Sequence, residues 1–440
     1  MMNRRDFLKT AGTGAAVLGV AACAPKAAQN VVEENGAAPV LKGEMAQNYP
    51  GVSLLGYGCM RWPMTQDENG NNVIDQQKVN ELVDFAIEHG VNYFDASPTY
   101  LGGECEAATS EALNRHPREK WLLATKMSNF SNWTLENSKT MYRESLRIYR
   151  TDHIDYYLLH SIGNLKTFNT RFGDTGIMDF LLDERKKGHI RNLGFSFHGS
   201  PEGLKDLLAL HGKYHWDFVQ IQMNYIDWYQ GPAEELYNML DALKIPVVIM
   251  EPLLGGRLGN VPAPLAQSLK QMTPGRSVAS WAFRFCGSFP RVLTVLSGMT
   301  YMEHLQDNLS TFLDFKPLKD KEYDELKEVA ELFKKYPMVD CNDCKYCMPC
   351  PYGIDIPGIF SFYNKTVNEA TYVTSSEQKG YARARRKYLL EYNKAIPTIR
   401  QADHCIACGE CMKECPQHIR IPGELKRIDN YIESLKQELL

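Results

Sequence analysis

Eight cysteines form two short runs near the C-terminus, at spacings typical of metal ligands. The first run, in which two residues separate successive cysteines, consists of Cys341, Cys344, Cys347 and Cys350. The second run, in which three residues precede the last cysteine, consists of Cys405, Cys408, Cys411 and Cys415. In runs of this kind three cysteines bind one [4Fe–4S] cluster, and the fourth, which precedes a proline, binds a second cluster. We therefore predict two [4Fe–4S] clusters with crossed ligation.

Zinc and disulfide bonds are the alternatives for these thiols. Zinc sites usually combine two CxxC pairs that lie a dozen or more residues apart. Disulfides within runs this short would close strained loops. The first run departs from the expected spacing by one residue before Cys350. We still favour the iron–sulfur interpretation. Residues 357–371 and 380–395 have helical periodicity, so we expect an α-helical ferredoxin-like domain around the clusters.

A second set of reactive side chains lies earlier in the chain, each at the end of a short apolar segment. Its members are Asp95, Lys126, His160 and Gln222, with Tyr100 five residues after Asp95. A tyrosine can donate a proton to a forming alkoxide, but its usual pKa is near 10. We expect the lysine cation to lower the phenol's pKa, the aspartate to hold the lysine, and the histidine to polarise a carbonyl. The alternative is an ion pair beside unrelated surface groups.

The elements that carry these residues alternate between apolar and helical patterns from about residue 50 to 315. The eight predicted strands are 52–58, 91–97, 121–127, 154–160, 191–197, 218–224, 246–250 and 291–298. Eight strand–helix units over about 250 residues are typical of a (β/α)8 TIM barrel, whose active site lies at the carboxyl ends of the strands. A doubly wound α/β sheet is the second choice, although no G-x-G-x-x-G motif follows the first strand.

Several motifs of this region resemble, in order and spacing, those of the aldo/keto reductase superfamily. They are VNYFDASPTYLGGECE, LLATK, YYLLHS and QIQMNY, and with the cysteine runs the whole chain is similar to the branch fused to a C-terminal ferredoxin domain. The resemblance implies that Tyr100 is the general acid/base, that Asp95 and Lys126 tune it, and that His160 orients the carbonyl. It implies NADP or NAD as cofactor.

The resemblance also implies positions for the nucleotide. Its nicotinamide would lie near Gly58, Cys59, Ser196, Gln222 and Asn224. Its pyrophosphate would lie near Leu253, Gly255 and Arg257, and its adenosine near Gly298, Met299, Thr300, Asp307 and Asn308. The chain departs from the family at four positions around the nucleotide. After the predicted fifth strand, Ser196-Phe197 replaces the common Ser-Asn. Met250 replaces an aromatic residue, and Gly298 and His304 replace the lysine and arginine that commonly bind a 2′-phosphate. The choice between NAD and NADP therefore stays open.

The first residues resemble an export signal. NRRDFLK, residues 3–9, is close to a twin-arginine motif, and the apolar stretch after it is too short to span a membrane. VAAC, ending at Cys23, resembles a lipoprotein cleavage site. The predicted domains are a signal at 1–23, a flexible linker at 24–47, the barrel at 48–315 and the ferredoxin-like domain at 316–440. We expect export to the periplasm or a membrane-anchored place in the cell envelope.

These patterns predict an exported oxidoreductase that acts on a small carbonyl or alcohol substrate. The net charge of −4 over 440 residues gives no sign of nucleic-acid binding. The clusters would exchange electrons with a redox partner protein, or else serve as structural staples. The alternative function is an electron-transfer or partner-binding protein whose barrel has little turnover. The aromatic residues expected near the substrate are Trp133, Phe168, Trp228 and Tyr229.

Overall fold

The computed structural model describes residues 41–440, so the predicted signal and Cys23 lie outside the described residues. The described chain forms two compact units that are discontinuous in sequence. The first, which we call the barrel unit, comprises residues 41–252 and 280–323. The second, the cysteine unit, comprises residues 253–279 and 324–440. Among the described residues, no helix is both long enough and apolar enough to cross a membrane.

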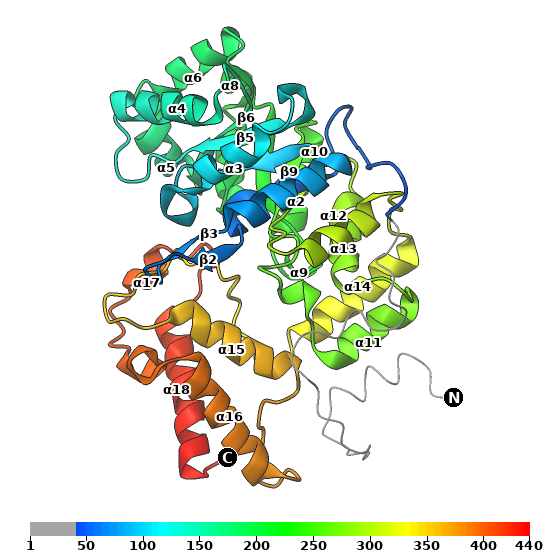
Figure 1. The fold of residues 1–440 in the computed structure, drawn as a ribbon, viewed down its shortest axis with the longest axis vertical. Coiled ribbons are helices and arrows are strands. Elements are labelled where there is room, and N and C mark those ends of the chain that lie inside the picture. The colour runs from blue at the N-terminus through cyan, green and yellow to red at the C-terminus, as the bar shows by residue number, and fades with distance from the viewer. Residues whose placement is uncertain (1–40) are drawn as a thin grey trace. The chain divides into compact units, whose positions relative to one another are not determined.

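The barrel unit is built on eight parallel strands that close on themselves in the order β1-β10-β9-β8-β7-β6-β5-β4. Figure 1 labels β5, β6 and β9 among them. Their bounds are β1 Leu55–Gly58, β4 Tyr93–Asp95, β5 Leu122–Met127, β6 Ile154–Ile162, β7 Ile190–Phe197, β8 Phe218–Gln222, β9 Val247–Met250 and β10 Val292–Ser297. Each lies within, or within two residues of, a segment predicted from apolar spacing, and the TIM-barrel prediction is confirmed. The short hairpin of β2 (Met64–Gln66) and β3 (Asn72–Ile74) was not predicted, because its side chains are largely exposed.

Helices follow the strands and cover the barrel with their apolar faces. They are α2 Gln76–Glu88, α3 Cys105–Leu113, α4 Leu135–Tyr149, α5 Leu165–Phe168, α6 Ile177–Lys186, α7 Pro201–Leu208, α8 His211–Tyr214, α9 Tyr225–Gln230, α10 Ala233–Ala242, α12 Ala279–Gly287 and α13 Met302–Phe312. Helix α2 buries Val79, Leu82, Val83 and Ala86, as its periodicity predicts. Ser200 caps α7 by accepting a hydrogen bond from the backbone N–H of Gly203.

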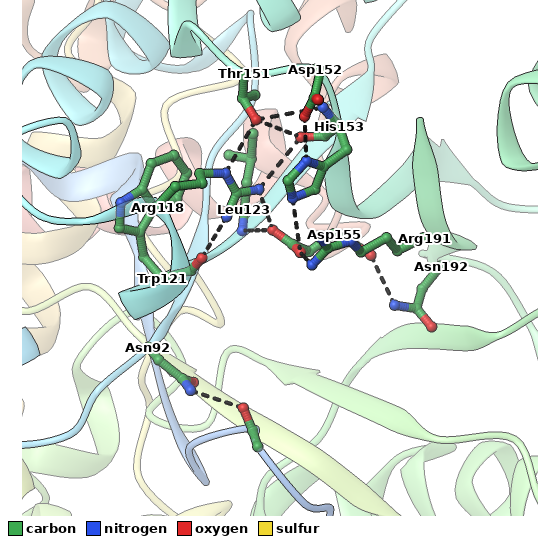
Figure 2. Close-up of polar contacts among 11 residues, drawn as sticks. Asn92, Arg118, Trp121, Leu123, Thr151, Asp152, His153, Asp155, Arg191 and Asn192 are labelled. Carbon is green, nitrogen blue, oxygen red and sulfur yellow. Dashed lines mark hydrogen bonds and ion pairs between the residues drawn. The ribbon is translucent and has the colours of Figure 1, made fainter. Parts of the chain in front are cut away.

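The amino-terminal end of the barrel is held by a buried carboxylate near the start of β6. Asp155 is 1% exposed and forms ion pairs of 2.6 Å with Arg118 and 2.8 Å with Arg191 (Figure 2). Its Oδ2 also accepts the backbone N–H of Leu123 at 2.9 Å, which ties β5 to β6. This network lies at the end opposite the carboxyl ends of the strands, so its role is to stabilise the barrel.

The cysteine unit is helical around its own apolar core. Its longer helices are α11 Ala263–Met272, the second half of α14 Asp320–Phe333, α15 Ile356–Asn368, α16 Tyr381–Ala395 and α18 Ile421–Gln437, with the short α17 Glu410–Lys413. Helices α15, α16 and α18 pack against one another, and the core includes Phe360, Tyr392 and Leu425. The helical periodicity of residues 357–371 and 380–395 thus predicted α15 and α16.

Candidate active site and cysteine clusters

A buried ion pair lies at the carboxyl ends of β4 and β5. Lys126 Nζ is 2.5 Å from Asp95 Oδ1 and donates a second hydrogen bond of 2.8 Å to the carbonyl of Ala96. Gln220 donates to the other oxygen of Asp95 at 3.3 Å. Lys126 is fully buried and Asp95 is 4% exposed. The parallel register of the two strands brings the residues together, so a cation is fixed inside the mouth of the barrel.

Tyr100 is brought over this ion pair by a tight turn after β4. The turn is the 3-10 element η2 (Tyr100–Gly103), in which Leu101, Gly102 and Gly103 all have positive φ. Glycines adopt this conformation without the steric cost that a side chain brings, which explains YLGG at this point. The centroid of the Tyr100 ring is 4.8 Å from Lys126 Nζ and 5.7 Å from that of the His160 ring, in an edge-to-face arrangement.

His160 lies beside a bulge near the end of β6. The pairing of β6 with β7 shifts between Leu159 and Ile162, and Ser161 has a φ of 55°. Bulges next to active sites redirect side chains. Arg171, from the π-helical turn η4 (Asn169–Gly173), donates to the carbonyls of His160 at 2.7 Å and Ser161 at 3.1 Å. The Arg171 guanidinium therefore holds the backbone at His160 and at the residue after it.

The imidazole of His160 is neutral and oriented by serine hydroxyls. Burial, together with the positive charges of Lys126, His198 and Arg171, holds the pKa of His160 well below its usual range. Its Nδ1 lies 2.6 Å from the Ser128 hydroxyl, which in turn lies 2.9 Å from the Ser97 hydroxyl. If Ser128 donates to Nδ1, the ring proton is on Nε2 and that nitrogen can donate to a substrate.

Burial also dominates the acidity of Tyr100 and Asp95. It raises the pKa of the Tyr100 phenol well above its usual range, and the charge of Asp95 adds to the rise. The direction set by burial is thus opposite to the one expected from the Lys126 ammonium alone. Burial raises the pKa of Asp95 as well, opposed by Lys126 and Gln220. Tyr100 consequently keeps its proton at neutral pH.

The residues predicted near the nicotinamide lie at the ends of β1, β7 and β8. Gly58 pairs in register with Asp95, and Cys59 is fully buried. The Ser196 hydroxyl accepts the backbone N–H of Ser161 at 2.8 Å. Asn224 caps α9 and donates to Asp227 at 2.6 Å, while Gln222 donates to the same carboxylate at 2.8 Å. Gly58, Ser196 and Gln222 thus lie at the mouth, whereas the Asn224 amide is engaged in capping.

On the adenosine side, the predicted residues follow β10. The Tyr57 hydroxyl donates to the carbonyl of Met299 at 2.6 Å, Thr300 donates to the carbonyl of Arg61 at 2.9 Å, and Asn308 donates to Ser297 at 2.9 Å. Asp307 is half-buried on α13. The Arg61 side chain packs over Gly298, where a Cβ would lie 3.1–3.3 Å from its carbons. An arginine therefore lies beside the position where the family commonly has lysine, so the residues present fit a phosphate-bearing nucleotide.

Leu253, Gly255 and Arg257, predicted near the pyrophosphate, belong to the cysteine unit. Arg257 forms an ion pair of 3.1 Å with Asp340, and its side chain is 9% exposed. Gly255 contacts the backbone of Asn342.

The first three cysteines of the first run meet the last cysteine of the second. A small cavity is lined by Cys341, Cys344, Cys347 and Cys415, with Ile356, Phe360 and Ile421 among the apolar side chains around it. Burial and the neighbouring thiols, Cys415 among them, raise the pKa of Cys347 to about 12. Four thiols around one apolar cavity fit a [4Fe–4S] cluster and give the crossed ligation that the spacing predicts.

The second set mirrors the first. Burial and the charges of Cys405, Cys408 and Cys350 raise the pKa of Cys411 to about 11. Cys408 is exposed, unlike the other seven cysteines of the two runs, which are partly buried. All cysteines from residue 41 onward are free thiols. In the same residues, no group of three or more His, Cys, Asp or Glu side chains is positioned to hold a single metal ion.

Sequence reasoning missed several residues that support the site. Three of them lie two positions from a predicted site residue, on the same strand or just beyond its end: Ser97, Ser128 and Gln220. Because alternate residues of a strand point to the same face, each lies on the same side of its strand as that site residue. That spacing could have identified them. Arg171 gave no such signal, because it reaches the site from a loop.

The aromatic residues near His160 also differ from the prediction. Phe130 is 44% exposed, and its ring centroid is 5.0 Å from that of His160. Of the predicted aromatic residues, Trp133 is exposed, but Phe168 is buried and Trp228 packs on Phe289. Tyr229 donates to the carbonyl of Tyr323.

Comparison with known proteins agrees with this architecture. The aldo/keto reductase family model matches residues 54–331, and the 4Fe-4S dicluster domain model matches residues 340–421. The uncharacterized oxidoreductase YqkF of Bacillus subtilis is 25% identical over 288 residues, which cover 59% of this chain and 86% of that protein.

Two solved structures show the same barrel fold. The holo form of aldo-keto reductase AKR11C1 from Bacillus halodurans superposes with a TM-score of 0.52 at 22% identity, covering 67% of this chain and 97% of that one. An aldo/keto reductase from Klebsiella pneumoniae in complex with NADP and acetate has the same TM-score and identity, covering 63% and 92%. The family match spans more than half of the chain, and the second match contains all eight clustered cysteines. The chain is an oxidoreductase that belongs to the aldo/keto reductase family and carries a C-terminal 4Fe-4S dicluster domain.

Proposed function

We propose that this protein reduces the carbonyl group of a small substrate, or oxidises the corresponding alcohol, with NADP or NAD as cofactor. The observation that supports this most strongly is the buried Lys126–Asp95 ion pair beneath Tyr100. A structural ion pair would not need a half-buried phenol on one side and a neutral histidine on the other. Together, Tyr100 supplies a proton donor, Lys126 a fixed cation and His160 a second hydrogen-bond donor to one carbonyl oxygen.

The side chains divide the proton chemistry between them. When bound, the nicotinamide supplies the hydride to the carbonyl carbon. The carbonyl oxygen accepts hydrogen bonds from the Tyr100 hydroxyl and from His160 Nε2. As negative charge develops on that oxygen, the Tyr100 O–H bond breaks and its proton passes to the oxygen. The resulting phenolate is stabilised by the Lys126 ammonium, and Asp95 and Gln220 keep that ammonium in place.

Tyr100→Phe tests this assignment in the full-length protein purified anaerobically. Loss of general acid catalysis should lower kcat for carbonyl reduction by about 10²- to 10⁴-fold. Iron, sulfide and visible cluster absorbance should not change. Tyr93→Phe is the matched control, because this buried tyrosine on β4 makes no side-chain hydrogen bond among the described residues. Equal turnover by the two variants would refute the role of Tyr100.

We further propose that both cysteine sets bind [4Fe–4S] clusters and exchange electrons with a redox partner protein. The exposed Cys408 and the 61% exposed Ile406 support an approach to the second cluster from the surface. The proposal includes export by the twin-arginine route and lipidation at Cys23, which rest on the sequence alone. Fractionation of wild type and a variant with both N-terminal arginines replaced by lysine tests export, since only the wild type should reach the envelope.

A second candidate function is electron transfer or partner binding with little turnover in the barrel. It is favoured by the exposure of Cys408 and Ile406, which leaves the second cysteine set accessible to a partner protein. The two functions predict different results when NADPH is the only reductant added to the protein and a carbonyl substrate. Turnover with NADPH and no other reductant supports the enzyme, whereas cluster reduction without any turnover supports the carrier.

A further inference from the structure

The loop after β9 packs within the cysteine unit. Strand β9 is the seventh of the barrel, and loops after the seventh and eighth strands of TIM barrels frequently bind phosphate. In this loop, Gly255 lies directly against the residue after Cys341. A Cβ on Gly255 would be 2.2 Å from the carbonyl oxygen of Asn342 and 2.6 Å from its Cα. No side chain fits there, so the loop and the first cysteine run are in backbone contact.

Two more contacts fix the same loop to the cysteine unit. Arg257 forms its ion pair with Asp340, immediately before Cys341, and its guanidinium carbon lies 5.3 Å from the centroid of the Phe333 ring. The carbonyl of Asn260 accepts a hydrogen bond of 2.6 Å from Asn368 on α15. The loop is therefore held at both ends by the elements that surround the first cysteine set.

The backbone of the loop needs such support. Leu254, Gly255 and Gly256 have φ values of 47°, 66° and 98°, three successive residues in the left-handed region. A leucine in this region costs free energy, and such conformations persist only where their surroundings hold them. Here the surroundings are Asp340 and Asn342, on either side of Cys341. The shape of the loop thus depends on how that cysteine run is held.

We propose that cluster binding at Cys341, Cys344, Cys347 and Cys415 is coupled to nucleotide binding through this contact. A cluster bound to Cys341 fixes Asp340 and Asn342, and these hold residues 254–257 in the conformation that receives the nucleotide phosphates. Coupling between two binding sites is reciprocal, so bound nucleotide must raise the affinity of these cysteines for the cluster by the same factor. A more tightly held cluster should also be lost more slowly. The nucleotide half of this inference rests on the proposed function, whereas the contact between loop and cluster site does not.

A matched pair of glycine variants isolates the contact. Gly255→Ala forces a Cβ against Asn342, whereas Gly256→Ala, at a φ of 98°, meets nothing within 4 Å. Both variants carry backbone strain, but only the first disturbs the cluster site. The measurement is the rate at which anaerobically purified full-length protein loses iron and visible absorbance in air, with and without saturating NADP⁺. Hydrogen exchange of residues 251–262 reports the loop itself.

We expect NADP⁺ to slow cluster loss in wild type by about fivefold, the lower end of typical couplings. Gly256→Ala serves as the control for cluster loss without nucleotide. Gly255→Ala should lose its clusters faster without nucleotide and gain no protection from it. Identical cluster loss and exchange in the two glycine variants would overturn the proposal. If Gly255→Ala does not fold, Asp340→Asn removes the ion pair without steric change and should raise exchange of the loop by up to about fivefold. Unchanged exchange in that variant would overturn the proposal too.

Nucleotide binding is measured separately by tryptophan fluorescence. If NADP⁺ does not bind, the proposed cofactor is wrong and the coupling to nucleotide is refuted with it. The contrast between the glycine variants without nucleotide then still tests the contact between the loop and the cluster site. If NADP⁺ binds but protects no cluster, the coupling is refuted and the proposed function stands.

Discussion

Replacement of Lys126 by methionine tests the electrostatics of the site most directly. Methionine keeps the apolar stem of this fully buried side chain but removes the ammonium that contacts Asp95 and Ala96. Asp95 is then left with one hydrogen-bond partner, Gln220 at 3.3 Å. Removing one member of a buried ion pair typically destabilises a protein by about 3–5 kcal/mol.

The loss of stability should depend on pH, with a definite sign. Burial raises the pKa of Asp95 and Lys126 opposes that rise, so Lys126→Met raises the pKa of the native state further above that of the unfolded chain. Between these two values the native state binds more protons than the unfolded state. The stability of the variant therefore falls as pH rises, by up to about 1.4 kcal/mol per pH unit. Wild type should show a smaller fall.

The assay is urea unfolding followed by tryptophan fluorescence from about pH 5 to pH 8, with wild type in parallel. The difference between the two midpoints should grow with pH and level off when Asp95 is ionised in both proteins. Carbonyl reduction should fall by about 10²-fold or more, because the phenolate loses its cation. If the urea midpoints of Lys126→Met and wild type change in parallel with pH, Asp95 is not a buried, unpaired carboxylate in the variant. If the variant reduces carbonyls as fast as wild type, the Lys126 ammonium does not stabilise the Tyr100 phenolate.

Three further predictions concern other parts of the chain. Asp155→Ala leaves Arg118 and Arg191 without their buried carboxylate, which should lower the free energy of unfolding by about 3–5 kcal/mol. The thermal midpoint should fall and the iron content should not change. An unaltered midpoint would contradict the role assigned to this network. Arg61→Ala should weaken NADP⁺ binding about 10- to 100-fold in a fluorescence titration, and equal affinity would exclude a phosphate contact. Cys415→Ser should alter the paramagnetic signal of the cluster bound by the first run in the reduced protein, whereas retention of both cluster signals would disprove crossed ligation.

Much of the architecture follows from local sequence. Strands such as β5 and β6 are short apolar segments between helical patterns, and their spacing alone predicted the closed barrel. Because parallel strands end at one edge, Asp95, Lys126 and His160 could be placed together before any contact was known. The cysteine spacing likewise predicted which thiols share a site. In each case the signal lies within a few residues, since apolar periodicity and ligand spacing are properties of short segments.

Tertiary packing decided the rest. Arg171 reaches His160 from the turn η4, which follows β6, and the loop at Gly255 lies against Asn342, 87 residues later. Nothing in the local sequence indicates either pair of partners. The acidity of Tyr100 is set by desolvation, which depends on everything that surrounds the ring rather than on the lysine that the motif supplies. Contacts between segments far apart in the chain, and the exclusion of water they produce, exist only once the chain has folded.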